Sequence, residues 1–262
     1  MDLQLEGKHV LVTGGSRGIG FACAEQFLAE GCVVSIVGRD KSRIGDACRT
    51  LDVHMKGISG YAADLSQPAA ALGVIADAEE ERGPIDVLVN AAGGARRKPF
   101  DELQPEDWRA AMEAKFLTYI NVLDPLIKLM AQRRAGSVVN VVGMGGKVPI
   151  TTHLAGGSAN AALMLATAGL ALAYGPMGVR VNALNPAKTN TDRLAEGVSA
   201  FARQERITTA EAIAEANNSS PLGRPASPAE VAAVVAFLAS PKAGYISGAI
   251  VSMDGAARPM VV

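Results

Sequence analysis

A glycine-rich segment near the amino terminus has the residue types that bind a phosphate group. It reads Thr13-Gly14-Gly15-Ser16-Arg17-Gly18-Ile19-Gly20 and lies between an apolar run, residues 9–12, and an amphipathic stretch, residues 19–28. Glycines let the backbone turn sharply and approach a pyrophosphate, and the free N–H groups of a helix amino terminus favour negative charge. The alternative is an ordinary glycine turn, but a position at the first strand–helix junction favours a dinucleotide site.

Two arginines lie where a protein distinguishes the two nicotinamide dinucleotides. An acidic residue after the second strand hydrogen-bonds the ribose 2′-hydroxyl of NAD and repels a 2′-phosphate. This chain has Gly38-Arg39 at that point, and Arg17 lies in the glycine turn. Two guanidinium groups can hold a phosphate by paired hydrogen bonds, the alternative being two solvated surface arginines. The pair favours NADP(H) as the cofactor.

Short apolar runs alternate with amphipathic stretches, and this alternation predicts the elements that position these residues. Strict alternation of strand and helix indicates parallel strands with helices on both faces. Apolar runs indicate strands that are buried on both sides. The strands are predicted at residues 9–12, 33–37, 60–63, 85–89, 137–142, 179–184 and 249–253. The helices are predicted at residues 19–28, 41–51, 68–82, 105–132, 154–174 and 228–238. We therefore predict an α/β, Rossmann-like, doubly wound fold with a seven-stranded parallel sheet.

The chain is predicted to form a single dinucleotide-binding domain over residues 1–262. Its 262 residues are 49% hydrophobic, which suffices for one large core, and no linker or repeat divides them. The stretch 185–224 interrupts the alternation and is rich in polar residues and alanine. Long insertions in compact domains are usually lids or binding loops, so we expect a substrate loop there.

Charge and cysteine content exclude several classes of partner. The 25 Lys and Arg residues balance 26 Asp and Glu residues, so no basic excess is present to bind nucleic acid. The three cysteines have no metal-binding spacing and make a disulfide framework improbable. No signal peptide is recognised in residues 1–8, and the apolar stretch 159–173 is shorter than the roughly 20 residues of a membrane span. We expect a cytoplasmic protein without a metal site or membrane segment.

Later segments extend the glycine motif in a fixed order. They are Asp64-Leu65, Asn90-Ala91-Ala92-Gly93, the segment 185–191 with Ala187 in place of a glycine, and a carboxyl-terminal pattern at 223–225 and 253–255. Together these motifs resemble those of the short-chain dehydrogenase/reductase family over essentially the whole chain. The resemblance implies a cofactor site formed by Gly14, Ser16, Arg17, Gly18, Ile19, Gly20, Arg39, Asp64, Leu65, Asn90, Ala91, Gly93, Pro186, Thr189 and Thr191.

The catalytic residues that this resemblance implies are missing. Family members carry Ser-x12-Tyr-x3-Lys and an asparagine on the helix after the fourth strand. The serine, tyrosine and lysine positions fall here on Gly143, Gly156 and Asn160, and the asparagine position falls on Lys115. None of the four tyrosines is followed by lysine four residues later, so a shifted alignment does not restore the pair.

Three residues are candidates to replace the missing groups. Lys115 lies in a mostly apolar helix and could supply an ammonium, a proton or a Schiff base; the alternative is a snorkelling surface lysine. His153 precedes Gly156 by three residues on the same helix face and could reach the vacated space; the alternative is a solvated histidine. Asn160 can hydrogen-bond a ribose hydroxyl. Lys147, Thr151 and Thr152 are candidates for substrate contact or simple loop residues.

Two further expectations concern the space and the surface around these residues. Gly143 and Gly156 should open a cavity beside the nicotinamide, and we expect Lys115 to point into it. The helix segment 159–173 is apolar almost all round and must be buried on every side, so we predict a homo-oligomer, with the resemblance implying a tetramer.

Three functions are compatible with this pattern. The first is an oxidoreductase that uses NADP(H), has a non-standard acid/base set and acts on a carbonyl or hydroxyl group of an unknown small molecule. The second is a non-redox lyase or hydrolase that reuses the pocket. The third is a pseudoenzyme that binds NADP(H) as a scaffold or sensor. The retained glycine turn favours the first and the third, and we adopt the first.

Overall fold

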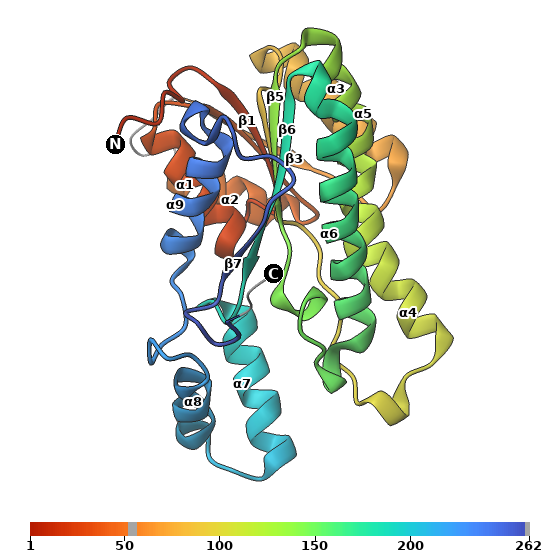
Figure 1. Cartoon of the computed structure of the whole chain (residues 1–262), viewed down its shortest axis with the longest axis vertical. Helices are drawn as coiled ribbons and strands as arrows, with labels where there is room; N and C mark the ends of the chain where they lie inside the picture. The colour runs from red at the N-terminus through yellow and green to blue at the C-terminus, as the bar shows by residue number, and fades with distance from the viewer. Residues whose placement is uncertain (52–56, 260–262) are drawn as a thin grey trace.

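A twisted parallel sheet forms the centre of the molecule (Figure 1). The computed structural model describes residues 1–51 and 57–259. Its strands are β1 (His9–Thr13), β2 (Val33–Gly38), β3 (Ile58–Ala62), β4 (Val87–Asn90), β5 (Gly136–Val141), β6 (Val179–Pro186) and β7 (Ile250–Met253). The order is β3-β2-β1-β4-β5-β6-β7, and each neighbouring pair is parallel. The predicted Rossmann-like, seven-stranded parallel fold is confirmed.

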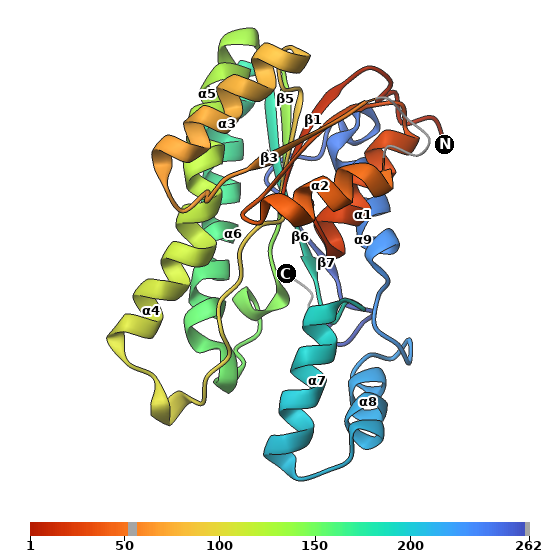
Figure 2. The same cartoon turned by 180° about the vertical axis from the view of Figure 1, so that it is seen from behind.

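Helices cover both faces of the sheet (Figures 1 and 2). One face carries α1 (Gly18–Ala29), α2 (Lys41–Leu51) and α9 (Pro228–Ala239); the other carries α3 (Pro68–Arg82), α5 (Thr118–Arg133) and α6 (Leu154–Tyr174). Strand side chains alternate between the faces: Val10 and Val12 join the core under α1 and α9, whereas Leu11 joins the core under α3 and α5. Both faces are therefore apolar, which explains the unbroken apolar runs of the strands.

The helix after β4 contains a π turn. A single helix over 105–132 was predicted, whereas the structure has α4 (Pro105–Ala111), the π turn Met112–Leu117 and then α5. The Thr118 hydroxyl donates to the Glu113 carbonyl at 3.0 Å, a contact five residues apart along the chain. π turns often occur at functional sites, and this one carries Lys115.

The stretch 185–224 is more ordered than the predicted loop. Two helices, α7 (Asp192–Glu205) and α8 (Thr209–Asn218), extend beyond the carboxyl ends of the strands (Figure 1). A capping box starts α8, because the Thr208 side chain accepts from the Glu211 amide while the Glu211 carboxylate accepts from the Thr208 amide. The sequence prediction did not identify these two helices, although alanine, glutamate and arginine, which are frequent here, are good helix formers. The assignment of this stretch as a substrate-binding insertion stays a prediction.

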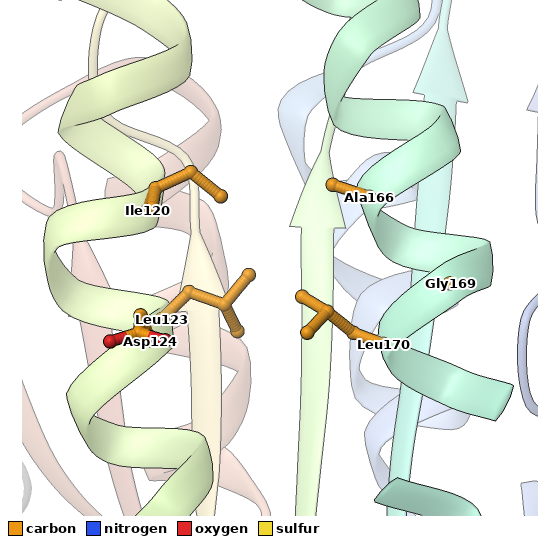
Figure 3. Close-up of a pocket in the computed structure, with 6 residues that line it drawn as sticks. All are labelled: Ile120, Leu123, Asp124, Ala166, Gly169 and Leu170. Atoms are coloured by element: carbon orange, nitrogen blue, oxygen red, sulfur yellow. The ribbon is translucent and has the colours of Figure 1, made fainter. Parts of the chain in front are cut away.

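Helix α6 has the predicted bounds 154–174, and the helical stretch around it extends further on both sides. By length and composition Thr151–Met177 could cross a membrane, so the argument from insufficient length was wrong. Half of its most apolar window is buried, and α6 packs on β6 and the π turn as a core helix. Two of its leucines nevertheless face outward, Leu165 at 77% and Leu172 at 83% exposure. An apolar groove beside them is lined by Ile120, Leu123, Asp124, Ala166, Gly169 and Leu170 from α5 and α6 (Figure 3).

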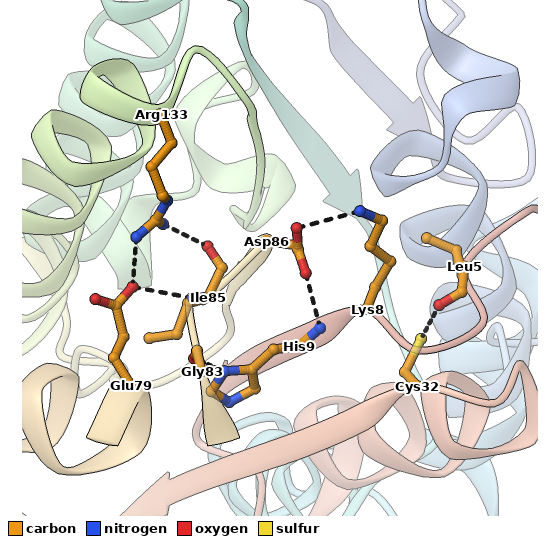
Figure 4. A network of polar contacts seen from close by, with 9 residues as sticks. All are labelled: Leu5, Lys8, His9, Cys32, Glu79, Gly83, Ile85, Asp86 and Arg133. Atoms are coloured by element: carbon orange, nitrogen blue, oxygen red, sulfur yellow. Dashed lines mark hydrogen bonds and ion pairs between the residues drawn. The ribbon is translucent and has the colours of Figure 1, made fainter. Parts of the chain in front are cut away.

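A polar network joins the elements at the amino ends of β1 and β4 (Figure 4). The buried His9 ring contacts the Gly83 carbonyl through Nδ1 at 2.7 Å and the Ser35 hydroxyl through Nε2 at 2.9 Å. The Asp86 carboxylate accepts from the His9 amide at 3.0 Å and from the Lys8 ammonium at 3.3 Å. These contacts stabilise the edge of the sheet opposite the carboxyl ends, where the candidate site lies.

Candidate active site

The glycine turn follows β1 at the point where the strand order changes direction. Gly14 and Gly18 have φ of +71° and +58°, which favour glycine. A Cβ on Gly14 would lie 2.9 Å from the Ala92 Cα, and one on Gly20 would overlap the Gly14 carbonyl. Helix α1 begins at Gly18 without a side-chain cap, so its first N–H groups are free to bind an anion. These close approaches and free donors fit the pyrophosphate of a dinucleotide.

Arg17 lies in the glycine turn, and Arg39 directly follows β2. Both are exposed, and neither has an ion-pair partner among the described side chains. The Ser16 hydroxyl lies 3.3 Å from the Cβ position of Gly38, which brings the glycine turn to the end of β2. Ile19 is partly buried against the α1 core cluster. Two unpaired guanidinium groups at one corner fit a ribose 2′-phosphate.

The loop after β3 is held by hydrogen bonds. The Asp64 carboxylate accepts from the amide and the hydroxyl of Ser66 at 3.1 and 2.8 Å. The Asn121 amide of α5 donates to the carbonyls of Leu65 and Ser66, each at 3.0 Å. Leu65 is buried while Asp64 remains exposed, so the Asp64 carboxylate lies at the surface of this loop.

A buried polar chain crosses the sheet beneath the turn. Thr13 donates to Asn90 at 3.3 Å, Asn90 donates to Asn140 at 3.1 Å, and Asn140 donates to Thr167 of α6 at 3.0 Å. The Thr13 hydroxyl also accepts from the backbone amide of Ala91 at 3.1 Å. Asn90 thus fixes the carboxyl ends of three strands relative to α6. Asn140 and Thr167 were missed by the sequence reasoning because each is an ordinary residue of its element until the strands pair.

The segments after β4 and β6 both reach the glycine turn. A Cβ on Gly93, whose φ is +78°, would overlap the Ala114 carbonyl, so this loop packs directly on the π turn. The Thr191 methyl lies 3.5 Å from the Cβ position of Gly18. Pro186 ends β6, and Thr189 is buried and bridged to Ala226.

Lys115 points into the protein from the π turn. Its side chain is 9% exposed, and its Nζ donates to the Tyr119 hydroxyl at 2.6 Å and to the Val141 carbonyl at 3.2 Å. The ammonium lies 4.2 Å from the centroid of the Tyr119 ring. Burial, with the positive charge of Arg193 as a smaller cause, lowers the pKa of Lys115 to about 7. Burial also raises the pKa of Tyr119, which is fully enclosed.

The His153 ring fills space over Gly156. A Cβ on Gly156 would lie 2.6 Å from His153 Nε2 and 2.8 Å from the Ala95 Cβ. His153 Nδ1 is buried without a hydrogen-bond partner among the described residues. Burial first, then the charges of Arg97, Arg193 and Lys115, lower the pKa of His153 to about 4. The imidazole is therefore neutral at neutral pH, and it occupies part of the space expected to be open.

Asn160 and Gly143 face each other across the end of β5. The Asn160 Nδ2 lies 3.3 Å from the Cβ position of Gly143, and its buried Oδ1 has no partner among the described residues. An unpaired buried amide oxygen can accept a hydrogen bond from a ligand hydroxyl. Lys147 instead donates to the Ile250 carbonyl at 2.9 Å and to the Ser252 hydroxyl at 3.0 Å, so it attaches this loop to β7.

The remaining two candidates lie in the loop that leads into α6. Thr151 is exposed, and the Thr152 carbonyl accepts from the Lys98 amide at 2.9 Å. That bond joins the loop after β4 to the loop before α6.

Comparison with known proteins gives one consistent result. The family model described as Enoyl-(Acyl carrier protein) reductase matches residues 14–256. The 3alpha-hydroxysteroid dehydrogenase of Mediterraneibacter gnavus is 31% identical over 260 residues, covering 98% of this chain and 100% of the relative. The chain belongs to the short-chain dehydrogenase/reductase family.

Two further members of the family are similar along their whole length. The 2,3-dihydroxy-2,3-dihydro-p-cumate dehydrogenase of Pseudomonas putida is 31% identical over 254 residues, covering 97% of this chain and 95% of the relative. The L-sorbose reductase of Gluconobacter frateurii, solved in complex with NADPH and L-sorbose, has a TM-score of 0.93 and 27% identity, with 100% of both chains covered.

This short-chain dehydrogenase/reductase also has basic residues at the site that the sequence reasoning missed. They are Arg97 after β4, Lys188 after β6 and Arg193 in the first turn of α7, and all three are exposed. The Arg193 guanidinium carbon lies 2.7 Å from the Cβ position of Gly94, so α7 reaches the loop after β4. The run Arg96-Arg97-Lys98 beside the family's asparagine–glycine motif was the available signal.

Proposed function

We propose that this family member is an NADP(H)-dependent oxidoreductase that interconverts a carbonyl and a hydroxyl group on a small molecule. The observation that carries the proposal is the intact glycine turn with Arg17 and Arg39 at one corner. A chain that had abandoned the dinucleotide would have no need for glycines at such close backbone approaches. The similarity to a reductase solved with NADPH supports the same cofactor.

Lys115 is proposed as the acid/base group in place of the missing tyrosine. When bound, NADPH supplies the hydride that reduces the carbonyl carbon. The Lys115 ammonium then donates a proton to the carbonyl oxygen and is reprotonated from solvent; the reverse reaction uses the neutral amine. A pKa of about 7 suits this role, because both protonation states are populated near neutral pH. Tyr119 and the Val141 carbonyl position the nitrogen.

His153 and Asn160 are proposed to position the reactants. The neutral His153 imidazole can hydrogen-bond a substrate oxygen but carries no charge at neutral pH. The unpaired Asn160 Oδ1 can accept from a ribose hydroxyl of the cofactor. Neither group replaces the positive charge of the family's lysine, and we assign that charge to Lys115.

One observation favours a second candidate, an NADP(H)-binding protein without turnover. The Lys115 nitrogen already donates to two acceptors, and no Tyr-x3-Lys pair occurs in the sequence. A lysine that only neutralises a buried acceptor pair would leave cofactor binding intact and the chemical step unassisted. The two candidates differ in whether Lys115 affects turnover.

The test measures NADPH oxidation with a panel of aldehydes and ketones, using Lys115→Met and Lys128→Met. Lys128 lies on α5 in an exposed ion pair with Asp124, so it is the matched control. We expect kcat of Lys115→Met to fall by roughly 10²- to 10⁴-fold, because a positioned general acid contributes that much. In Lys115→Met, kcat should also lose its pH dependence near pH 7. Lys128→Met should keep both the unsubstituted kcat and its pH dependence.

Stability separates lost chemistry from misfolding. The lowered pKa means that the unfolded chain binds the Lys115 proton more tightly than the folded protein, so burying this ammonium destabilises the fold at pH 7. The Val141 carbonyl keeps the Tyr119 hydroxyl as a donor at 2.7 Å after substitution. The Tm of Lys115→Met should therefore equal or exceed that of the unsubstituted protein. Unchanged turnover in a Lys115→Met protein that still binds NADPH would show that a different residue is the acid. An unsubstituted protein that binds NADPH but turns over no compound of the panel would support the second candidate.

A further inference from the structure

Three exposed basic side chains converge on one side of the candidate active site. The Arg193 guanidinium packs on Gly94, and Ala95, next in that loop, packs on the position that His153 and Gly156 share. Arg97 follows in the same loop. The loop after β4 therefore connects Arg193 of α7 with the start of α6.

These cations form no ion pair within the described part of the chain. Among the side chains that the structure describes, no Asp or Glu forms an ion pair with Arg97, Lys188 or Arg193. Burial lowers the pKa of Lys188, and the negative charge of Glu215 on α8 partly offsets this shift. Partial burial first, and then the positive charge of Arg193, lower the pKa of Arg97, so the two like charges repel each other. Such an arrangement is unfavourable unless a negative group lies among the cations.

The phosphates of a dinucleotide have their own partners elsewhere. We assign the 2′-phosphate to the corner with Arg17 and Arg39 beside β2, and the pyrophosphate to the uncapped start of α1. In the sheet, β2 lies on one side of β1, whereas β4 and β5 lie on the other. Arg97 and His153 belong to loops of β4 and β5, so these basic residues lie on the side where the proposed acid, Lys115, is found.

We infer that the substrate carries a carboxylate group, which Arg97 and Arg193 bind while its carbonyl faces Lys115. This inference rests on the proposed function, because it assigns the substrate class of the same site. Two guanidinium groups from different elements fit a planar carboxylate, and each can donate paired hydrogen bonds. Lys188 adds positive potential near Arg97, and the neutral His153 lies within the field of both Arg97 and Lys115.

The experiment measures binding rather than turnover. Protein saturated with NADPH is titrated by calorimetry with benzoylformate and with methyl benzoylformate, which share one ketone and differ in charge. We expect benzoylformate to bind at least about 10-fold more tightly at low salt, with the advantage shrinking as salt is added. Arg97→Met and Arg193→Met should each remove the advantage. Arg96→Met, an exposed neighbour in the same loop, is the matched control and should keep it.

The remaining outcomes separate the two proposals. Equal affinity for the two compounds in the unsubstituted protein overturns the inference, whether or not either ketone is reduced. Weaker NADPH binding in Arg193→Met, with the benzoylformate preference retained, also overturns it, because Arg193 would then serve the cofactor. Preferential binding of benzoylformate without NADPH oxidation supports the carboxylate site and contradicts the proposed redox function.

Discussion

Burial shifts the pKa values of Lys115 and His153, so that the two side chains have different protonation states at neutral pH. The pKa of Lys115 falls to about 7 and that of His153 to about 4, with desolvation as the largest cause for both. At neutral pH the lysine is therefore divided between its two forms, while the histidine is neutral. The expectation that His153 serves as an acid near neutrality depended on an unshifted pKa, and its surroundings lower that pKa.

Arg39 is predicted to select the cofactor. Arg39→Asp places a negative charge where a 2′-phosphate would bind, so it should weaken NADPH binding and favour NADH. Fluorescence titration should show NADPH binding more tightly than NADH before the substitution and the reverse order after it. Arg49→Asp makes the same charge change on α2 and should leave the order unaltered. Equal affinities in the unsubstituted protein would contradict the assignment of Arg17 and Arg39.

Gly156 is predicted to be necessary for the buried position of the His153 ring. A methyl group at this position must move either His153 or Ala95, because both are closer than van der Waals contact allows. Gly156→Ala should lower the free energy of unfolding by about 1–3 kcal/mol, as overpacking does, and expose the imidazole. NMR titration should then show the His153 pKa rising from about 4 toward 6.5, the ordinary value of a solvated histidine. Gly73→Ala on α3 has open space around it and should be neutral or slightly stabilising.

At the scale of elements, backbone geometry delivers the site residues to one edge of the sheet. The π turn sets the rotation of the helix that carries Lys115, and Gly93 lets the loop after β4 press against that turn. At the start of α7, Thr191 contacts Gly18 of the glycine turn and Arg193 contacts Gly94. Each contact joins elements that are distant in the chain, so a small shift of one helix changes several groups of the site together.

The His9 network at the opposite edge predicts a pH-dependent stability. Burial lowers the pKa of His9 below 6.5 in the folded protein, so the unfolded chain binds the proton more tightly as the pH falls below 6.5. The free energy of unfolding should decrease between pH 7 and 5, by at most about 1.4 kcal/mol per pH unit for one group. The free energy of unfolding, measured with urea at each pH, should be lower for His9→Gln at pH 8. It should also change less with pH than that of the unsubstituted protein.

His153→Gln provides the comparison for that measurement. His153 also has a lowered pKa, so its replacement should remove its own share of the slope and leave the His9 share. A slope unchanged by His9→Gln would show that its ring is not the group that titrates.

At the scale of the whole molecule, the outward face of α6 predicts self-association. Leu165 and Leu172 are exposed beside the apolar groove between α5 and α6. Exposed leucines next to an apolar groove on a core helix are typical of a surface that a partner covers. We therefore keep the prediction of a homotetramer, in which α6 is enclosed by another copy.

Light scattering tests this assembly. The unsubstituted protein should have four times the 27.0 kDa mass of one chain. Leu165→Lys and Leu172→Lys should reduce that mass, because each places a charge in an apolar interface. Ile213→Lys alters a comparable exposed residue on α8 and should leave the mass unchanged. A monomer at micromolar concentration before any substitution would contradict the prediction.

Local periodicity and backbone demands were enough to predict the fold from the sequence. Apolar runs separated by amphipathic stretches correctly placed each strand and most helices, since burial on two faces imposes that pattern. The turn at Gly14 and Gly18 was equally legible, because few residues other than glycine adopt such φ values. The π turn could not be predicted, because a hydrophobic pattern does not distinguish backbone hydrogen bonds between residues five apart from those between residues four apart.

The chemistry of the site was decided by tertiary structure. The sequence alone identified Lys115 and His153 as candidates, but their pKa values depend on desolvation and on charges contributed by Arg97 and Arg193. Neighbouring members of this group are 18 to 40 positions apart in the chain, and they meet only after the strands are ordered and α7 folds back. Electrostatic interaction depends on distance through space and on the surrounding dielectric, and sequence spacing specifies neither.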